Sequence, residues 1–301
     1  MNIYSAISAN KLKTWLIMVL FVVFITTLVF VFSKALGYSP LGITGIALVF
    51  AGLTSVGSFY YSDKLVLASV GAKEIKKQDN PLLFRTVENL CIGAGLPMPR
   101  VYVINDQSPN AFATGRDPNH SVVCVSAGIL NLLNKSELEG VIAHELSHIK
   151  NYDIRLMAVV AILVGFIAII ADMFMRSLWW KGINNDDNRG SGNIQLVFFA
   201  IGIVFAILSP VVATLIQLAV SRKREFLADA SGALLTRYPE GLATALEKLD
   251  KDKTPLRKAS NATAHLFIEN PFNKKQSGNW LASLFDTHPP IEERIKILRS
   301  M

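Results

Sequence analysis

Long stretches without charged residues are the feature that most limits how this chain can fold. Twenty uncharged residues separate Lys13 from Lys34, 28 separate Lys34 from Asp63, and 32 separate Arg189 from Arg222. Another apolar run, charged only near its end, lies between the second and third of these. Since about 20 apolar residues let a helix cross a bilayer core, the chain is predicted to be a membrane protein. The expected spans are residues 14–33, 39–60, 156–176 and 194–220.

Short polar connections should join these spans into two hairpins. The connections cover residues 33–38 and 181–192, so both lie on the same side of the membrane. The N-terminus and residues 62–153 and 222–301 then lie on the other side. Lysine and arginine are more frequent next to the span ends that face these segments. The positive-inside rule therefore places the N-terminus and both segments in the cytoplasm. The first run is too long for the apolar part of a signal peptide and is expected to remain as an anchor.

Charged and aromatic residues mark the end of the third span. Asp172 and Arg176 stand four positions apart, a spacing at which side chains on one helix can pair. Trp179 and Trp180 follow, and tryptophan is enriched where a bilayer meets water. This end of the span is therefore expected at the membrane surface.

The composition fits a membrane protein and argues against nucleic-acid binding. Charged residues make up only 18% of the chain, whereas soluble proteins carry roughly 25%. The net charge is +7, yet no basic stripe with interleaved aromatic residues is present, as nucleic-acid binding would require. Cys91 and Cys124 have neither metal-ligand nor disulfide-framework spacing and are expected to be buried thiols.

The soluble segments are predicted to form an α+β domain in which a small sheet packs on helices. Strands are expected at residues 97–104 and 121–126, separated by a turn-rich segment. Helices are expected at residues 81–93, 137–152, 224–236, 241–250 and 290–298. Ser136 and Glu139 have the spacing of a capping box at the start of the second of these helices. Polar residues 251–279 are predicted to form a loop, either flexible or closing over a cleft.

The sequence V-I-A-H-E-L-S-H points to metal chemistry on the helix at 137–152. His144 and His148 are four residues apart, so their Cβ atoms would lie about 5–6 Å apart on one face. Two imidazoles so placed can bind one zinc ion at about 2.0–2.1 Å. Glu145 then stands beside the ion, where a general base for an attacking water belongs. Either histidine alone would be unremarkable, but the set predicts a zinc protease site with one ion per chain.

A zinc ion held by two histidines needs a third protein ligand and one open position. Glu225 and Asp229 are four residues apart on the helix expected after the fourth span. Glu225 could bind the ion while Asp229 accepts a hydrogen bond from a ligand histidine. From spacing alone, Glu225 is equally well explained as a surface carboxylate that balances the basic residues 222–224.

Taken together, these motifs resemble the membrane zinc metalloproteases of the M48 group. The resemblance rests on the His144–His148 motif, on Glu225-x-x-x-Asp229 after a membrane hairpin, on T-H-P-P at 287–290 and on N-A-F-A-T-G at 110–115. It covers essentially the whole chain. It implies a gluzincin-like domain on the cytoplasmic face of the bacterial inner membrane, with Glu225 as third zinc ligand and Asp229 supporting a ligand. It also implies stress-linked cleavage of damaged or misfolded membrane proteins.

Two further residues have two interpretations each. The resemblance suggests that His288 lies near the site and stabilises the transition state, but Thr287 and the following prolines also fit a plain helix start. Asn110 could lie at the edge of the cleft, where a substrate strand pairs with the enzyme. It could equally belong to an ordinary turn.

The expected organisation has four parts, namely residues 1–62 and 154–221 as membrane hairpins and residues 63–153 and 222–301 as two halves of one catalytic domain. The second hairpin would bring His148 and Glu225 together and hold the ion near the bilayer surface. Charged residues on both sides of the histidine motif argue against a site inside the bilayer. The remaining alternative is a non-enzymatic scaffold or transporter with a structural zinc, whose fourth ligand could be His120, His265 or His288.

Overall fold

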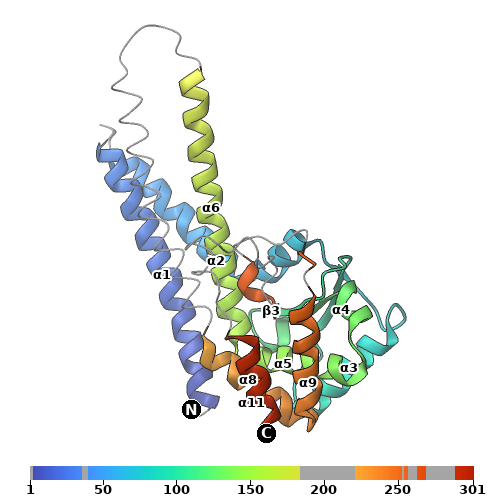
Figure 1. Cartoon of the computed structure of the whole chain (residues 1–301). Coiled ribbons are helices and arrows are strands. Elements are labelled where there is room, and N and C mark those ends of the chain that lie inside the picture. Colours follow the sequence, from blue (N-terminus) through green and yellow to red (C-terminus); the bar gives the residue numbers. More distant parts are fainter. Residues whose placement is uncertain (1–2, 36–39, 184–220, 253, 257–262, 269–288) are drawn as a thin grey trace.

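Three long helices project from a mixed α+β body (Figure 1). The computed structural model describes residues 3–35, 40–183, 221–252, 254–256, 263–268 and 289–301. The long helices are α1 (Ile3–Ala35), α2 (Pro40–Val70) and α6 (Asp153–Ile183). The predicted fourth span, the connection from residue 184 onward, His288 and much of residues 251–279 lie outside the described residues. So do the side chains of Asp172, Arg176, Trp179 and Trp180.

The long helices pack on one another through apolar side chains. Ile17 and Phe21 of α1 and Val160 and Leu163 of α6 belong to one buried cluster. Other apolar side chains of α1 and α2 remain exposed, including Leu53 at 67%, as is expected where lipid replaces water. Within the described residues, Ile7–Phe30 and Leu41–Val70 are long and apolar enough to cross a bilayer. Helix α2 continues ten residues past the predicted end at residue 60.

Four short strands form a mixed sheet in the order β1-β2-β4-β3. They are β1 (Lys73–Glu74), β2 (Arg100–Ile104), β3 (Ala111–Gly115) and β4 (Ser121–Ser126). Strands β2 and β4 are parallel, and β3 runs antiparallel to β4. The predicted turn-rich segment between β2 and β4 therefore contains a strand. The sequence A-F-A-T-G has weak strand propensity, and pairing with the buried strand β4 stabilises it instead.

The remaining helices surround α5, which carries the histidine motif (Figure 1). Helix α5 (Lys135–Lys150) contacts the sheet and the helices α3 (Pro81–Ala94), α8 (Arg222–Thr236) and α9 (Pro239–Lys251). The other helical elements among the described residues are α4 (Ala127–Leu132), α11 (Ile291–Arg299), η1 (Pro118–His120) and η2 (Ala264–Leu266). The described part of the body is thus a small sheet packed on helices, as predicted.

Both ends of α5 differ from the sequence prediction. Asn134 caps the helix by accepting a hydrogen bond from the Glu137 amide, and the Glu137 carboxylate accepts one from the Asn134 amide. The capping box therefore lies two residues before the predicted pair of Ser136 and Glu139, because asparagine is as strong an N-cap as serine. At the other end, Tyr152 adopts a left-handed conformation. The chain bends there by 83° between α5 and α6, which directs α6 away from the body.

Candidate metal centre

Helices α5 and α8 bring His144, His148 and Glu225 together in the interior of the body. One ligand atom from each of these residues lies within 4.8 Å of the other two. All three side chains are buried. Gly232 allows this close approach, since a Cβ atom there would lie 3.0 Å from the backbone nitrogen of His144. The sequence-predicted ligand set is thus assembled from segments more than 70 residues apart.

The donor atoms are spaced close to the distances of a tetrahedral zinc site. The two Nε2 atoms are 3.1 Å apart. Glu225 Oε2 lies 3.8 Å from His144 Nε2, and Glu225 Oε1 lies 3.5 Å from His148 Nε2. Ligands about 2.0–2.1 Å from a tetrahedral ion lie about 3.3–3.4 Å from each other. Two nitrogens and one carboxylate oxygen also match a catalytic zinc site in chemistry.

Each histidine of the cluster is held by a buried carboxylate on its Nδ1 atom. Asp229 Oδ1 lies 2.8 Å from Nδ1 of His144, and Asp153 Oδ2 lies 3.0 Å from Nδ1 of His148. A carboxylate acceptor places a proton on Nδ1, so each Nε2 can turn a lone pair toward an ion. The contact of Asp229 was expected from sequence, whereas that of Asp153 was missed. Its signal was its position directly after the motif helix, five residues beyond His148.

Arg294 of α11 fixes Asp229 in turn. Its guanidinium donates from Nε to Oδ2 at 2.8 Å and from Nη2 to Oδ1 at 2.7 Å. Burial raises the pKa of Asp229, but the charge and hydrogen bonds of Arg294, together with His144, outweigh it and hold the pKa at about 2. No local pattern in the sequence signals this arginine, because it lies 65 residues from its partner.

Acid should therefore lower the free energy of unfolding of the metal-free protein, because it protonates Asp229. The folded-state pKa of about 2 lies below the ordinary value of 3.8, so the stabilisation is complete above about pH 4 and is lost toward about pH 2. The shift corresponds to about 2 kcal/mol in the free energy of unfolding. We expect Asp229→Asn to be less stable than the wild type by about this amount at about pH 5 and by about a third of it at about pH 2.5. Urea unfolding of both proteins, in one detergent with chelator, measures the difference in stability at each pH. An equal difference at both pH values would contradict the stabilising role of the ionised Asp229.

A second buried network ties the metal centre to the first long helix. Asn10 of α1 donates from Nδ2 to Asp153 Oδ1 at 2.7 Å and to the Asn151 carbonyl at 3.0 Å. Its Oδ1 accepts from Arg224 Nη1 at 3.0 Å, and Arg224 lies 3.6 Å from Asp153. One amide side chain thus joins α1 with the chain segments that carry His148 and Glu225.

Glu145 lies beside the cluster without belonging to it. Its side chain is only 2% exposed. Burial raises the pKa of Glu145, against the lowering effect of the two histidines and of a hydrogen bond from the Ala113 backbone in β3. A carboxylate with a raised pKa is a better proton acceptor than one in water. His148 also has a raised pKa, of about 9, because Asp153 and Glu225 outweigh the effect of burial. An ion bound at its Nε2 would therefore displace a proton.

The chain itself covers the edge strand beside the site. Ile268 N–H donates to the Ala111 carbonyl of β3 at 3.0 Å, and the Phe267 ring lies 5.2 Å from that of Phe112. Asn110, which precedes β3, is buried, and its backbone N–H donates to Ser126 Oγ at 2.8 Å. The described structure is therefore closed around the metal centre.

Two of the candidate fourth ligands lie elsewhere. His120 is exposed and pairs with Asp117 at 2.8 Å, and His265 is buried with its Nε2 3.1 Å from the Met157 carbonyl. Within the described residues, the cluster consists of His144, His148 and Glu225. A tetrahedral zinc ion held by that set has one further position, and the remaining candidate for it, His288, lies outside the described residues.

Known proteins agree with this chemistry. Residues 77–301 match Peptidase family M48. The chain belongs to that family. It is 46% identical to a "Protease HtpX homolog" of Dictyoglomus turgidum, covering 99% of this chain and 94% of the relative. It is 47% identical to another from Tropheryma whipplei (strain TW08/27), covering 99% and 98%. The structure is also similar to that of S. mikatae Ste24p, with a TM-score of 0.49 and 18% identity, over 91% of this chain and 61% of that one.

Membership of the family establishes the general activity. The chain matches relatives named as HtpX-type proteases over nearly the full length of both proteins. Its buried His–His–Glu cluster could hold a metal ion. In the part of the chain that the structure describes, two helices are long and apolar enough to cross a bilayer. The chain is therefore a membrane metalloprotease that acts on protein substrates.

Proposed function

We propose that this protein is a zinc-dependent endopeptidase with His144, His148 and Glu225 as zinc ligands and Glu145 as general base. The observation that supports this assignment most directly is the donor geometry. Two Nε2 atoms and a carboxylate lie within 4.8 Å of each other, and buried carboxylates hold both imidazoles in the tautomer that binds metal. Zinc at this position would supply Lewis-acid chemistry, polarising a peptide carbonyl and acidifying water.

The residues of the chain account for the proton transfers. Glu145 accepts a proton from the attacking water and delivers it to the amine that leaves, and its raised pKa suits both steps. Asp229 and Asp153 keep His144 and His148 oriented throughout. The closed site excludes bulk water, which strengthens each of these electrostatic interactions. His288 remains a candidate for stabilising the transition state.

We further propose four membrane spans, with both termini and a gluzincin-like catalytic domain in the cytoplasm at a bacterial inner membrane. Residues 1–62 and 154–221 would form the two hairpins, and residues 63–153 and 222–301 the two halves of the domain. The start of α6 at Asp153 and the start of α8 at Arg222 support this division, because they flank the proposed second hairpin.

Damaged or misfolded membrane proteins are the proposed substrates, in stress-linked quality control. The full-length similarity to HtpX proteases supports this role. A substrate in an extended conformation could pair with the edge strand β3 near Asn110. That pairing would require the segment at Ile268 to leave the Ala111 carbonyl. An extended, unfolded segment could pair with β3 in this way, whereas a compact domain could not.

Removing and restoring the metal tests this function against the alternative of a non-enzymatic protein with structural zinc. Protein purified in detergent with chelator should not cut casein, and one equivalent of zinc should restore cleavage. Magnesium should not, because it disfavours nitrogen ligands. A protein that binds one zinc ion tightly but never cleaves an unfolded substrate would favour the structural alternative.

A further inference from the structure

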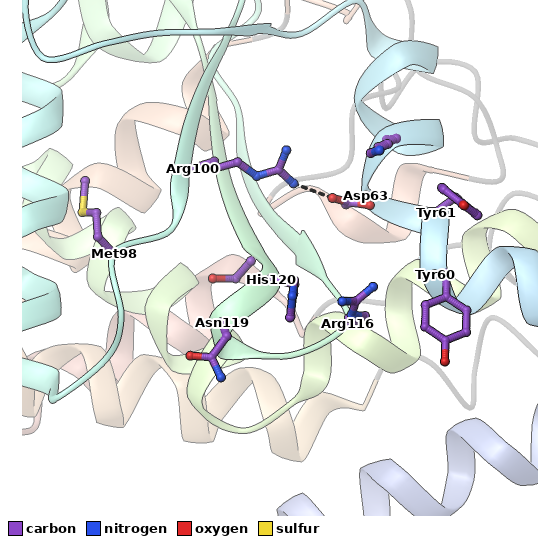
Figure 2. Close-up of a pocket in the computed structure, with 10 residues that line it drawn as sticks. Tyr60, Tyr61, Asp63, Met98, Arg100, Arg116, Asn119 and His120 are labelled. Atoms are coloured by element: carbon purple, nitrogen blue, oxygen red, sulfur yellow. Dashed lines mark hydrogen bonds and ion pairs between the residues drawn. The ribbon is translucent and has the colours of Figure 1, made fainter.

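A pocket separate from the metal centre lies where α2 meets the sheet (Figure 2). Its volume is about 460 Å³, within the range of about 300–1,000 Å³ that is usual for small-ligand sites. Three chain segments line it, namely the end of α2, the start of β2 and the connection from β3 to β4. The lining residues are Tyr60, Tyr61, Asp63, Lys64, Met98, Arg100, Arg116, Asn119, His120 and Ser121.

Positive charge predominates around this pocket. Arg100 pairs with Asp63 across it, as Figure 2 shows, and Arg116 lies 3.5 Å from Asp117. Lys64 is exposed and has no carboxylate within ion-pair distance among the described residues. Lys64, Arg100 and Arg116 thus have two carboxylates near them. Asp63 belongs to the lining, and Asp117 lies outside it. An anion entering the pocket would find Lys64 unpaired and both guanidinium groups already in place.

Aromatic side chains place the pocket at the level of the membrane surface. Helix α2 becomes apolar at Leu41, and about 20 residues of helix cross a bilayer core, which puts Tyr60 and Tyr61 near the interface. The Arg116 guanidinium lies 5.3 Å from the Tyr60 ring centroid, and the Lys64 ammonium 5.6 Å from that of Tyr61. Tyrosine with neighbouring basic residues is typical of the zone where lipid headgroups lie.

We propose that this pocket binds the phosphate of an anionic phospholipid headgroup. Lys64 and Arg116 would contact the phosphate, and the acyl chains would lie along the exposed apolar side chains of α2. Basic pockets beside transmembrane helices on the cytoplasmic side are known to hold such headgroups. Free inorganic phosphate shares the same chemistry, so the test must separate the two sources.

Three single substitutions test the proposal in the full-length protein. Lys64→Gln removes the unpaired charge from an exposed position without disturbing an ion pair, and Arg116→Gln removes the second phosphate contact. Lys77→Gln is the matched control, because it removes one exposed lysine that pairs with Glu88, outside the pocket lining. Thermal unfolding in detergent shows whether each variant keeps the wild-type fold.

Binding is measured by titrating phosphatidylglycerol or phosphatidylcholine into detergent-solubilised protein and counting bound lipids by native mass spectrometry. The wild type should retain one phosphatidylglycerol in clear preference to phosphatidylcholine. A basic residue at a lipid surface contributes about 1 kcal/mol, so Lys64→Gln and Arg116→Gln should each bind about fivefold more weakly. Lys77→Gln should match the wild type.

Three outcomes would overturn the proposal. Equal retention of both lipids would show that the pocket does not select anions. Equal weakening in Lys77→Gln would show that overall charge, rather than the pocket, attracts the lipid. Displacement of phosphatidylglycerol by inorganic phosphate at the same concentration would show that the site binds free phosphate instead. Because Lys64 is exposed and forms no ion pair with any carboxylate that the structure describes, the result for Lys64→Gln stands even if Arg116→Gln does not fold.

Discussion

Glu145→Gln should bind zinc as tightly as the wild type and cleave an unfolded protein about a thousandfold more slowly. Glutamine keeps the shape of the side chain but cannot accept a proton, and proton transfer by a positioned group contributes about 10²–10⁴-fold to a rate. Glu145 is not part of the ligand cluster, so the ion should remain bound. Burying a neutral amide also costs less than burying a carboxylate, and the variant should be at least as stable as the wild type.

The matched control for this variant is Glu139→Gln on the same helix. Glu139 faces outward, and its carboxylate lies 3.8 Å from Lys135. Zinc content is measured by mass spectrometry, and casein cleavage is followed over time. In both measurements Glu139→Gln should be indistinguishable from the wild type. Cleavage by Glu145→Gln at the wild-type rate would remove Glu145 from the mechanism. Loss of zinc together with activity would make it a ligand instead of a base.

Asn10→Leu should lower zinc affinity by about tenfold, although Asn10 lies on a membrane helix and does not touch the ion. The substitution removes the amide that holds Asp153 and Arg224, and loss of such support for a ligand typically costs about 10–100-fold in metal affinity. It also leaves buried polar groups with fewer partners, at about 1–3 kcal/mol of stability. Competition with a coloured chelator measures the affinity directly.

A change confined to α1 itself provides the control for Asn10→Leu. Thr14 is buried one turn further along, and its hydroxyl donates to the Asn10 carbonyl within the same helix at 2.8 Å. Thr14→Val should therefore leave zinc affinity unchanged. The absorption spectrum of the cobalt-substituted protein adds a readout of ligand geometry, and it should shift in Asn10→Leu alone. Unchanged affinity and spectrum in Asn10→Leu would show that Asn10 contributes only to packing.

The sequence was most informative where the chemistry depends on neighbours along one helix. His144, Glu145 and His148 are set by a four-residue spacing, and the structure brings both histidines to one point. Glu225 could be placed only by resemblance, because its distance from His148 along the chain carries no geometric information. Asp153 follows the motif helix closely enough to have been found, whereas Arg294 reaches Asp229 only in the folded chain, 65 residues away, so no pattern could identify it in advance.

Errors in the predicted fold also have local causes. Strand β3 was missed because A-F-A-T-G has weak strand propensity and lies between turn-forming residues, and its partner β4 determines its conformation. The start of α5 was displaced because two overlapping pairs of residues fit a capping box, and Asn134 with Glu137 forms it. Helices α1 and α2 were predicted correctly as long apolar helices because uncharged runs of that length are visible in the sequence, whereas the fourth predicted span lies outside the described residues. Their ends depend on contacts with the body.

Asp153 is both the first residue of α6 and a hydrogen-bond partner of His148. Bilayer thickness sets how far an apolar helix tilts, because the helix adjusts its tilt to match the hydrocarbon layer. A change in the tilt of α6 relative to α1 would therefore act on Asp153, which Asn10 holds from the other helix. We expect zinc affinity to vary among bilayers of different acyl-chain length. The metal centre would then respond to the thickness of the bilayer that surrounds the enzyme.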